Sequence, residues 1–256
     1  MSHFFITGCA GFIGSNLTSE LLTQGHTVTG IDNFDIFYDR SLKELNLDPF
    51  RNHPSFHFIE GDLLKNGLPS ATSAKIDVVI HLAAKVSVRP SLLYPDAYID
   101  NNIKGTLHVL EWMRKNNYKK LIFASSSSVY GNNKHVPFHE DLDVNEPISI
   151  YAFTKKSCEL LNFNYHILYN LDCINLRFFT VYGPRQRPDL AIRKFTELIK
   201  QNKPVKIYGD GFSSRDYTYI GDIVKGIIAS SDYFSDKKGV YEIINLENSS
   251  SITLIG

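Results

Sequence analysis

Cysteine is scarce in this sequence of 256 residues, which has three, Cys9, Cys158 and Cys173, and no CxxC pair. An odd, widely spaced set indicates neither a disulfide framework nor a zinc site, so we expect no bound metal. We expect three small buried side chains instead, in a protein that works in the reducing conditions of the cytoplasm.

An excess of charge and a long apolar run are missing as well. The 27 Lys and Arg residues balance the 27 Asp and Glu residues, which argues against a surface for nucleic acid. An anionic ligand therefore has to be held locally, by a few arginines and backbone amides. No apolar run approaches the length of a membrane span, and the apolar start at Phe4–Ile6 lacks the features of a signal peptide. We expect neither a nucleic-acid partner nor a membrane partner.

The sequence does have a regular alternation of short apolar runs with longer helical stretches in its first half. The runs are apolar throughout, as in parallel strands that are covered on both faces. Their order predicts an α/β fold with a Rossmann-type doubly wound parallel sheet. The predicted strands are His3–Thr7, Thr27–Ile31, Phe56–Glu60, Val78–His81 and Leu121–Ala124, and the predicted helices are Phe12–Gln24 and Ala97–Lys115.

The second half is less regular. It begins with a long predicted helix, Ile148–Tyr169, and a strand, Asp172–Phe178, after which prolines break the pattern. Two helices at Leu190–Gln201 and Ile220–Ser231 and a strand at Val240–Asn245 follow. We divide the chain into a dinucleotide-binding domain, residues 1–171, and a smaller C-terminal ligand lobe, residues 172–256, with segments that return to the main sheet.

A GxxGxxG motif, formed by Gly8, Gly11 and Gly14, follows the first strand and opens the first helix. Gly8 permits a tight turn, Gly11 lets the backbone approach a pyrophosphate, and Gly14 lets the helix pack closely on the sheet. The start of the helix, with Phe12 and Ile13, faces the negative charge. Because the motif lies between a strand and a helix, it predicts a dinucleotide site.

An acidic residue, Asp32, ends the second strand, 18 residues after Gly14. A carboxylate at this place accepts hydrogen bonds from both adenosine ribose hydroxyls and repels a 2′-phosphate, so it favours NAD over NADP. Asp followed by Asn33 is also a common turn. The position after the glycine loop favours the cofactor interpretation, and we include Asn33 in the predicted site.

Tyr151 and Lys155 lie one helical turn apart and so share a face of the predicted helix. A free tyrosine has a pKa of about 10, and lowering it to about 7 requires roughly 4 kcal/mol. A neighbouring ammonium and the positive nicotinamide ring both favour the phenolate. Tyr151 is therefore predicted to remove a proton from a substrate hydroxyl while hydride leaves the carbon for NAD⁺.

A YxxxK pair is common by chance, and the serine run Ser125–Ser128 is what supports this one. The run follows the predicted strand Leu121–Ala124. Hydroxyls at the carboxyl end of a central parallel strand lie in the ligand crevice of such sheets. One of them can therefore bond the reacting oxygen beside Tyr151.

Together these motifs resemble the extended short-chain dehydrogenase/reductase family, and within it the nucleotide-sugar epimerases. The resemblance spans essentially the whole chain. Besides the glycine loop and the Tyr–Lys pair, it rests on Gly61–Leu63, His81–Ala84, Asn102–Thr106, Ser126–Gly131, Leu176–Arg185, Tyr208–Gly211 and Arg215–Ile220.

The resemblance implies which residues hold the cofactor, NAD. Asp62 and Leu63 would contact the adenine, and Asn102 would stabilise the active-site helix. His81 is expected to be a core histidine. The residues that would line the pyrophosphate and ribose are Leu82, Ala83 and Ala84.

The resemblance also implies which residues react with and hold the sugar nucleotide. Ser126 would supply the catalytic hydroxyl, Tyr151 would be the base, and Lys155 would hold the nicotinamide ribose. A guanidinium suits a diphosphate, and Arg215 matches the arginine that clamps it. The serines that would lie near the sugar are Ser127 and Ser128.

The same two serines help to choose the reaction. Related 4,6-dehydratases and decarboxylases carry carboxylates where Ser127 and Ser128 stand, so the resemblance favours a 4-epimerase: C4 is oxidised, the keto-sugar turns over, and hydride returns to the other face. The UDP-galactose type usually has Asn at Thr180, so we prefer UDP-glucuronate, with Thr180 and Arg187 on its C6 carboxylate. UDP-glucose epimerisation, and a dehydratase or decarboxylase, remain open.

The alternative from another class is a protein that binds NAD without catalysis, and the intact Ser126, Tyr151 and Lys155 argue against it. Family members usually continue for several tens of residues beyond Gly256, so we expect an incomplete C-terminal lobe. The family forms dimers through helices that correspond to Ala97–Lys115 and Ile148–Tyr169, and we expect a homodimer here too.

Overall fold

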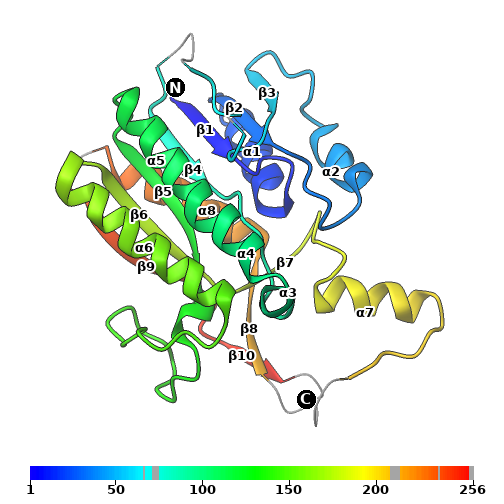
Figure 1. Cartoon of the computed structure of the whole chain (residues 1–256). Coiled ribbons are helices and arrows are strands. Elements are labelled where there is room, and N and C mark those ends of the chain that lie inside the picture. The colour runs from blue at the N-terminus through cyan, green and yellow to red at the C-terminus, as the bar shows by residue number, and fades with distance from the viewer. Residues whose placement is uncertain (66, 71–74, 208–213, 236, 254–256) are drawn as a thin grey trace.

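The computed structural model describes residues 1–65, 67–70, 75–207, 214–235 and 237–253. This part of the chain contains a seven-stranded sheet with the order β3-β2-β1-β4-β5-β6-β9 (Figure 1). Every neighbouring pair in it is parallel. The strands are β1 (His3–Thr7), β2 (Thr27–Asp32), β3 (Phe56–Glu60), β4 (Val78–His81), β5 (Lys120–Ser126), β6 (Asp172–Phe178) and β9 (Tyr241–Leu246). The predicted doubly wound sheet is confirmed.

The strand order reverses between β1 and β4. The chain first builds outward from β1 through β2 to β3, then returns to add β4 on the other side of β1. The register pairs Thr7 at the end of β1 with His81 at the end of β4. In an open parallel sheet, such a reversal leaves a crevice outside the carboxyl ends of the strands, where ligands bind.

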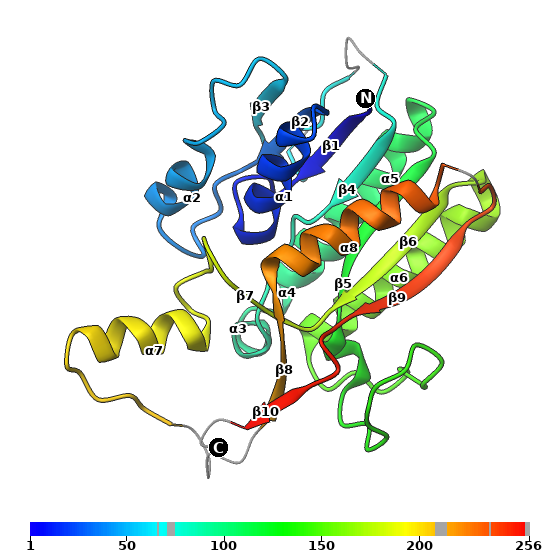
Figure 2. The same ribbon diagram turned by 180° about the vertical axis from the view of Figure 1, so that it is seen from behind.

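Helices cover both faces of the sheet. On one face lie α5 (Gly105–Lys115) and α6 (Ile150–Tyr169), in front in Figure 1, and on the other lie α1 (Phe12–Thr23) and α8 (Ile220–Tyr233), in front in Figure 2. Successive side chains of a strand point to opposite faces. In β1, Phe4 and Ile6 therefore join the core under α1 and α8, whereas Phe5 joins the core under α5 and α6.

A second, three-stranded sheet lies beyond the carboxyl ends of the large one. It has the order β10-β8-β7 and consists of β7 (Thr180–Tyr182), β8 (Ser214–Tyr219) and β10 (Ser251–Thr253). β8 runs parallel to β7 and antiparallel to β10. The helix α7 (Ala191–Lys200) protrudes beside this sheet, away from the large one (Figure 2).

Sequence patterns missed the short elements. The elements α2 (Arg40–Leu47), β7, β8 and β10 were not predicted, because they are short and only partly buried and so carry little apolar pattern. The predicted helix Ala97–Lys115 is a continuous run of α4 (Pro95–Tyr98), a π-helical segment η1 (Ile99–Lys104) and α5, preceded by α3 (Val88–Leu93). The Tyr208–Gly211 motif lies outside the described residues.

The structure also bears on the domain boundary and on membrane-spanning helices. The strand β6, which follows residue 171 directly, and the strand β9 are part of the large sheet, and the helix α8 covers one of its faces. Segments from the second half therefore do return to the main sheet, and the domain boundary at residue 171 stays a prediction. Across the described ranges, we find no helix that combines the length and apolarity needed to cross a membrane.

Candidate active site

A cleft with a cavity volume of about 450 Å³ runs along the carboxyl ends of the large sheet. It starts at the end of β1 with Thr7, passes Asp32 at the end of β2, and continues over the ends of β4 and β5. Beyond the end of β6 it reaches Thr180 and Arg187. The cleft therefore occupies the crevice at the reversal of strand order, and its two ends come from different halves of the chain.

The glycine loop forms the floor at one end of this cleft. At Gly8 the φ angle is +74°, and an added Cβ would lie 2.9 Å from the backbone nitrogen of Ala83. A Cβ on Gly14 would lie 2.2 Å from the carbonyl oxygen of Gly8. Only glycine fits at these two positions. The remaining predicted members of the loop, Gly11, Phe12 and Ile13, line the cleft as well.

Asp32 is buried and held by three donors. Its Oδ1 accepts hydrogen bonds from the backbone nitrogen of Phe34 at 2.9 Å and from Lys43 Nζ at 3.1 Å, and its Oδ2 accepts one from the nitrogen of Ala10 at 3.2 Å. Lys43, which sequence reasoning missed, is itself only 7% exposed and also lines the cleft. Because the ion pair balances the carboxylate, Asp32 repels a 2′-phosphate less than an unpaired acid would.

The other predicted cofactor residues lie along the same end, with one exception. Asn102 does not line the cleft. Its amide accepts a hydrogen bond from the nitrogen of Lys85 at 2.8 Å and donates to the Lys85 oxygen at 3.0 Å and to Thr154 Oγ1 at 2.9 Å. It thus ties the loop after β4 to α6 and acts on the site from behind. Residues that line the cleft as predicted are Asn33, Asp62, Leu63, Leu82, Ala83 and Ala84.

Tyr151 and Lys155 lie on the first two turns of α6 and both face the cleft, together with Ser126 from the end of β5. The side chain of Ser149 caps the helix by accepting a hydrogen bond from the nitrogen of Ala152. The cap fixes where α6 begins and so fixes the position of Tyr151. Ser126 Oγ lies 3.1 Å from Ser128 Oγ, within the short 3₁₀ turn η2 (Ser127–Tyr130). The structure therefore brings the three predicted catalytic side chains to one cleft.

Burial shifts the pKa values of both Tyr151 and Lys155. Burial raises the pKa of the Tyr151 phenol, although the Ser126 hydroxyl and the charge of Arg187 both act to lower it. Burial also lowers the pKa of Lys155 to about 8. The Lys155 ammonium donates to the carbonyl oxygen of Ala124 at 2.6 Å. The residues of the chain by themselves therefore leave the pKa of Tyr151 raised, and the expectation that Lys155 and the nicotinamide together lower it stays a prediction.

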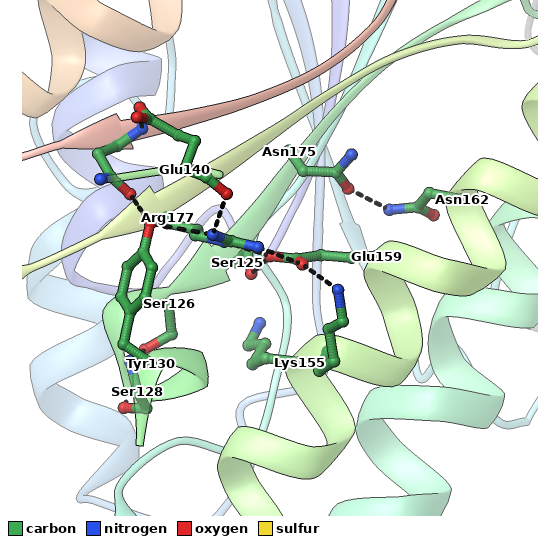
Figure 3. Close-up of polar contacts among 12 residues, drawn as sticks. Ser125, Ser126, Ser128, Tyr130, Glu140, Lys155, Glu159, Asn162, Asn175 and Arg177 are labelled. Carbon is green, nitrogen blue, oxygen red and sulfur yellow. Dashed lines mark hydrogen bonds and ion pairs between the residues drawn. The ribbon is translucent and has the colours of Figure 1, made fainter. Parts of the chain in front are cut away.

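A buried ion pair lies directly behind these residues (Figure 3). Arg177 of β6 donates to both carboxylate oxygens of Glu159 of α6, each at 3.0 Å, and Ser125 Oγ donates to the same carboxylate at 2.6 Å. Arg177 also donates to Tyr130 Oη at 2.9 Å. Since Glu159 follows Lys155 by one helical turn and Ser125 precedes Ser126, this cluster joins the two elements that carry the predicted catalytic groups.

The far end of the cleft carries the predicted sugar-binding residues. Ser127, Ser128, Thr180 and Arg187 all line it. Arg187 forms a bidentate pair with Asp189, with both N–O distances at 2.9 Å. Within the described part of the chain, its third guanidinium nitrogen, Nη1, is left without a hydrogen-bond acceptor.

Arg215 does not join the residues of the cleft. It lies on β8 with its side chain exposed, and its Nη1 donates to the carbonyl oxygen of Ser214 at 2.8 Å. The contact of Arg215 with a diphosphate therefore stays a prediction.

The remaining predictions from the sequence concern the core. His81 is buried, and both ring nitrogens have partners: Nδ1 lies 2.6 Å from Thr7 Oγ1, and Nε2 lies 3.1 Å from Thr106 Oγ1. Burial, and then the charge of Lys155, lower its pKa to about 3, so it is a neutral core histidine as expected. All three cysteines are free and buried, also as expected.

Comparisons with known proteins agree with this geometry. Residues 4–246 match the model of the NAD dependent epimerase/dehydratase family. The chain is 46% identical over 248 residues to the UDP-glucuronate 4-epimerase of Thermodesulfobacterium geofontis, covering 96% of this chain and 75% of that protein. The UDP-glucuronic acid 4-epimerase from Bacillus cereus, solved with UDP-glucuronic acid and NAD, superimposes with a TM-score of 0.92 at 38% identity, covering 99% of this chain and 80% of that one. A structure of UDP-galactose 4-epimerase gives a TM-score of 0.83 at 28% identity, covering 99% of this chain and 80% of that one.

Proposed function

The chain belongs to the NAD dependent epimerase/dehydratase family, and from this we propose that it inverts C4 of UDP-glucuronate, with NAD as its cofactor. The observation that carries the proposal is the single cleft that Ser126, Tyr151 and Lys155 share with the glycine loop. The residues fit a dinucleotide, because Gly8 and Gly14 leave no room for a Cβ, so that the turn after β1 and the start of α1 pack as closely as a pyrophosphate-binding loop requires. When bound, NAD accepts hydride from C4 and returns it.

The protein's own residues handle the proton and the orientation of the sugar. Tyr151 removes the proton of the C4 hydroxyl as the carbon is oxidised and returns it after the keto-sugar has turned over. The Ser126 hydroxyl bonds the same oxygen. Lys155, protonated at neutral pH with a pKa of about 8, supplies the positive charge that favours the phenolate once the nicotinamide adds its own. The two positive charges together therefore lower the pKa of Tyr151 as far as catalysis requires.

Epimerisation fits the cleft better than elimination or decarboxylation. At the positions that follow the catalytic serine, Ser127 and Ser128 line the cleft and offer hydroxyls rather than carboxylates. Hydroxyls can orient a sugar, but they do not exchange protons at neutral pH as a carboxylate does. The acid sugar is favoured by Arg187, whose free Nη1 can receive a carboxylate oxygen while Asp189 holds the other two nitrogens.

Product analysis with two substrates tests this function. Purified protein is incubated with UDP-glucuronate and separately with UDP-glucose, and the 4-epimers are identified by NMR. We expect a higher kcat/KM for UDP-glucuronate. Arg187→Ala should lower kcat/KM for the acid sugar at least tenfold more than for the neutral one, whereas Arg51→Ala, a change in an exposed pair with Asp48, should change neither. Equal or better use of UDP-glucose contradicts the choice of substrate.

The proposal includes a homodimer through α5 and α6. These helices lie side by side on the outer side of the large sheet (Figure 1). Apolar side chains on α6 are exposed at Phe153, Leu160 and Ile167, at 44%, 59% and 60%. Their spacing of seven residues places them on one face. Analytical ultracentrifugation should show a dimer that Leu160→Glu converts to a monomer, and a monomeric parent protein would contradict the proposal.

Two further expectations remain proposals. The division at residue 171 assigns NAD to the first half. Measuring whether residues 1–171, produced alone, bind NAD would test it. A cytoplasmic location suits the three free cysteines, and fluorescence microscopy of a tagged chain would test it.

A further inference from the structure

Ser87 has a backbone conformation that serine avoids. Its φ angle is +78° and its ψ angle is 133°. For a residue with a Cβ, this region is unfavourable, and it persists only where surrounding contacts impose it. Ser87 lines the cleft and lies in the loop between β4 and α3. A non-glycine residue that is strained beside a proposed active site raises the question of what its side chain does there.

The neighbouring side chains hold the backbone of this loop in place. Asn102 bonds both the nitrogen and the oxygen of Lys85. Tyr98 Oη donates to the carbonyl oxygens of Val86 and Ser87, the latter at 3.1 Å. Tyr98 is buried, and its ring packs edge-on against Tyr151 with a centroid distance of 6.4 Å. The position of the loop is thus fixed relative to the catalytic tyrosine.

The side chain of Ser87 joins this fixed loop to the sugar end of the cleft. Ser87 Oγ donates to Asp189 Oδ2 at 3.0 Å and accepts from Arg187 Nη2 at 3.1 Å. Burial raises the pKa of Asp189, but the hydrogen bonds from Arg187 and Ser87 outweigh it and leave the pKa lowered, so Asp189 is a carboxylate that accepts both. Three side chains from two distant segments therefore form one closed set of hydrogen bonds.

We propose that Ser87 is a positioning residue for sugar selectivity: its hydroxyl fixes the Arg187 guanidinium so that Nη1 meets the C6 carboxylate of an acidic sugar. The inference rests on the proposed function, because it assigns Arg187 to that carboxylate. Glycine would adopt the same backbone without strain but, among the described residues, would leave the Arg187 guanidinium with hydrogen bonds to Asp189 alone, two residues away. The loop would then no longer hold the guanidinium from the side of Tyr151.

Two substitutions at Ser87 separate the effect of its hydroxyl from the effect of its backbone strain. Ser87→Ala removes the hydroxyl and keeps the strained backbone, whereas Ser87→Gly removes both, so the glycine variant should have a higher Tm than the alanine variant. We expect the ratio of kcat/KM for UDP-glucuronate over UDP-glucose to fall about 3- to 10-fold in both variants, within the range for one ordinary hydrogen bond, because Arg187 keeps its bonds to Asp189. The loss should appear in KM for UDP-glucuronate. A merely structural role predicts instead that the effect follows Tm and reaches both sugars equally.

Arg187→Ala and the double variant Ser87→Ala/Arg187→Ala complete the experiment. We expect the second change to add nothing once Arg187 is gone. A ratio that stays within twofold of the parent in both Ser87 variants, while Arg187→Ala lowers it, overturns the role of Ser87 and leaves the proposed function standing. If Arg187→Ala also leaves the ratio unchanged, the assignment of the acidic sugar fails, and this inference with it. If neither sugar is turned over, the affinities for UDP-glucuronate and UDP-glucose are measured by calorimetry with saturating NAD. The ratio of these two affinities then replaces the ratio of kcat/KM in every comparison.

Discussion

Replacing Arg177 by Met should cost more stability than any change at the surface of this protein. Arg177 and Glu159 are each 1% exposed, and the guanidinium meets the carboxylate through two bonds of 3.0 Å (Figure 3). Breaking such a buried pair by removing one partner leaves an uncompensated charge, which typically costs about 3–5 kcal/mol.

The structure indicates which single change is worse. After Arg177→Met, the Glu159 carboxylate keeps its hydrogen bond from the Ser125 hydroxyl at 2.6 Å. It also keeps its ion pair with Lys156 Nζ at 3.7 Å. After Glu159→Gln, the Arg177 guanidinium has only neutral acceptors among the described residues: Tyr130 Oη, the oxygen of Glu140 and the new amide oxygen. We therefore expect Arg177→Met to cost about 3 kcal/mol and Glu159→Gln about 4–5 kcal/mol.

The double variant Glu159→Leu/Arg177→Met tests the reason behind these values. It removes both charges and fills the space with apolar groups, so its stability should lie within about 1 kcal/mol of the parent, far from the sum of the single losses. The assay is equilibrium unfolding in urea, with the slope m compared between variants. Arg51→Met, in an exposed pair with Asp48 at 3.6 Å, is the matched control and should change stability by less than about 1 kcal/mol. Single losses below about 1 kcal/mol, or a double variant as unstable as their sum, would refute the reasoning.

Three further predictions follow from the cleft. Tyr151→Phe should lower kcat about 10²- to 10⁴-fold with little change in NAD affinity, since it removes only the proton acceptor, and a kcat within tenfold of the parent would exclude Tyr151 as the base. Burial lowers the pKa of Lys155 from 10.5 to about 8, so the unfolded chain binds more protons than the folded one between these two pH values. Across this window, the free energy of unfolding of the parent should therefore rise with pH by about 3 kcal/mol relative to that of Lys155→Met. A difference between the two proteins in urea unfolding that does not change with pH would contradict this. Gly14→Ala should weaken NAD binding at least tenfold in a fluorescence titration, because its Cβ would lie 2.2 Å from the Gly8 oxygen, whereas Gly105→Ala, with its nearest neighbour at 4.0 Å, should bind NAD like the parent.

The parts of the fold that could be predicted are those that bury continuous apolar surface. The strands His3–Thr7, Phe56–Glu60, Val78–His81 and Asp172–Phe178 have the predicted bounds, because the strands of a parallel sheet that helices cover are mainly apolar. The strand β8 shows the opposite case. Its residues are largely exposed, so no apolar pattern distinguished it from a loop.

The candidate site divides in the same way. Local motifs fixed the glycine loop and the one-turn spacing of Tyr151 and Lys155, because the tight turn and the helix impose their geometry on neighbouring residues. The pKa of Tyr151 was not predictable in this way. It depends on how deeply the phenol is buried and on where the Lys155 ammonium points, which is toward the oxygen of Ala124.

The sequence by itself determined the strands of the large sheet, the glycine loop and the choice of Ser126, Tyr151 and Lys155 as predicted catalytic residues, since each follows from a local pattern in the chain. Only the tertiary structure decided the contacts between distant segments: Lys43 against Asp32, Arg177 against Glu159, and Ser87 against Arg187. The physical reason is that a charge or hydroxyl acts over a few ångströms, and packing of the whole chain chooses which groups come that close.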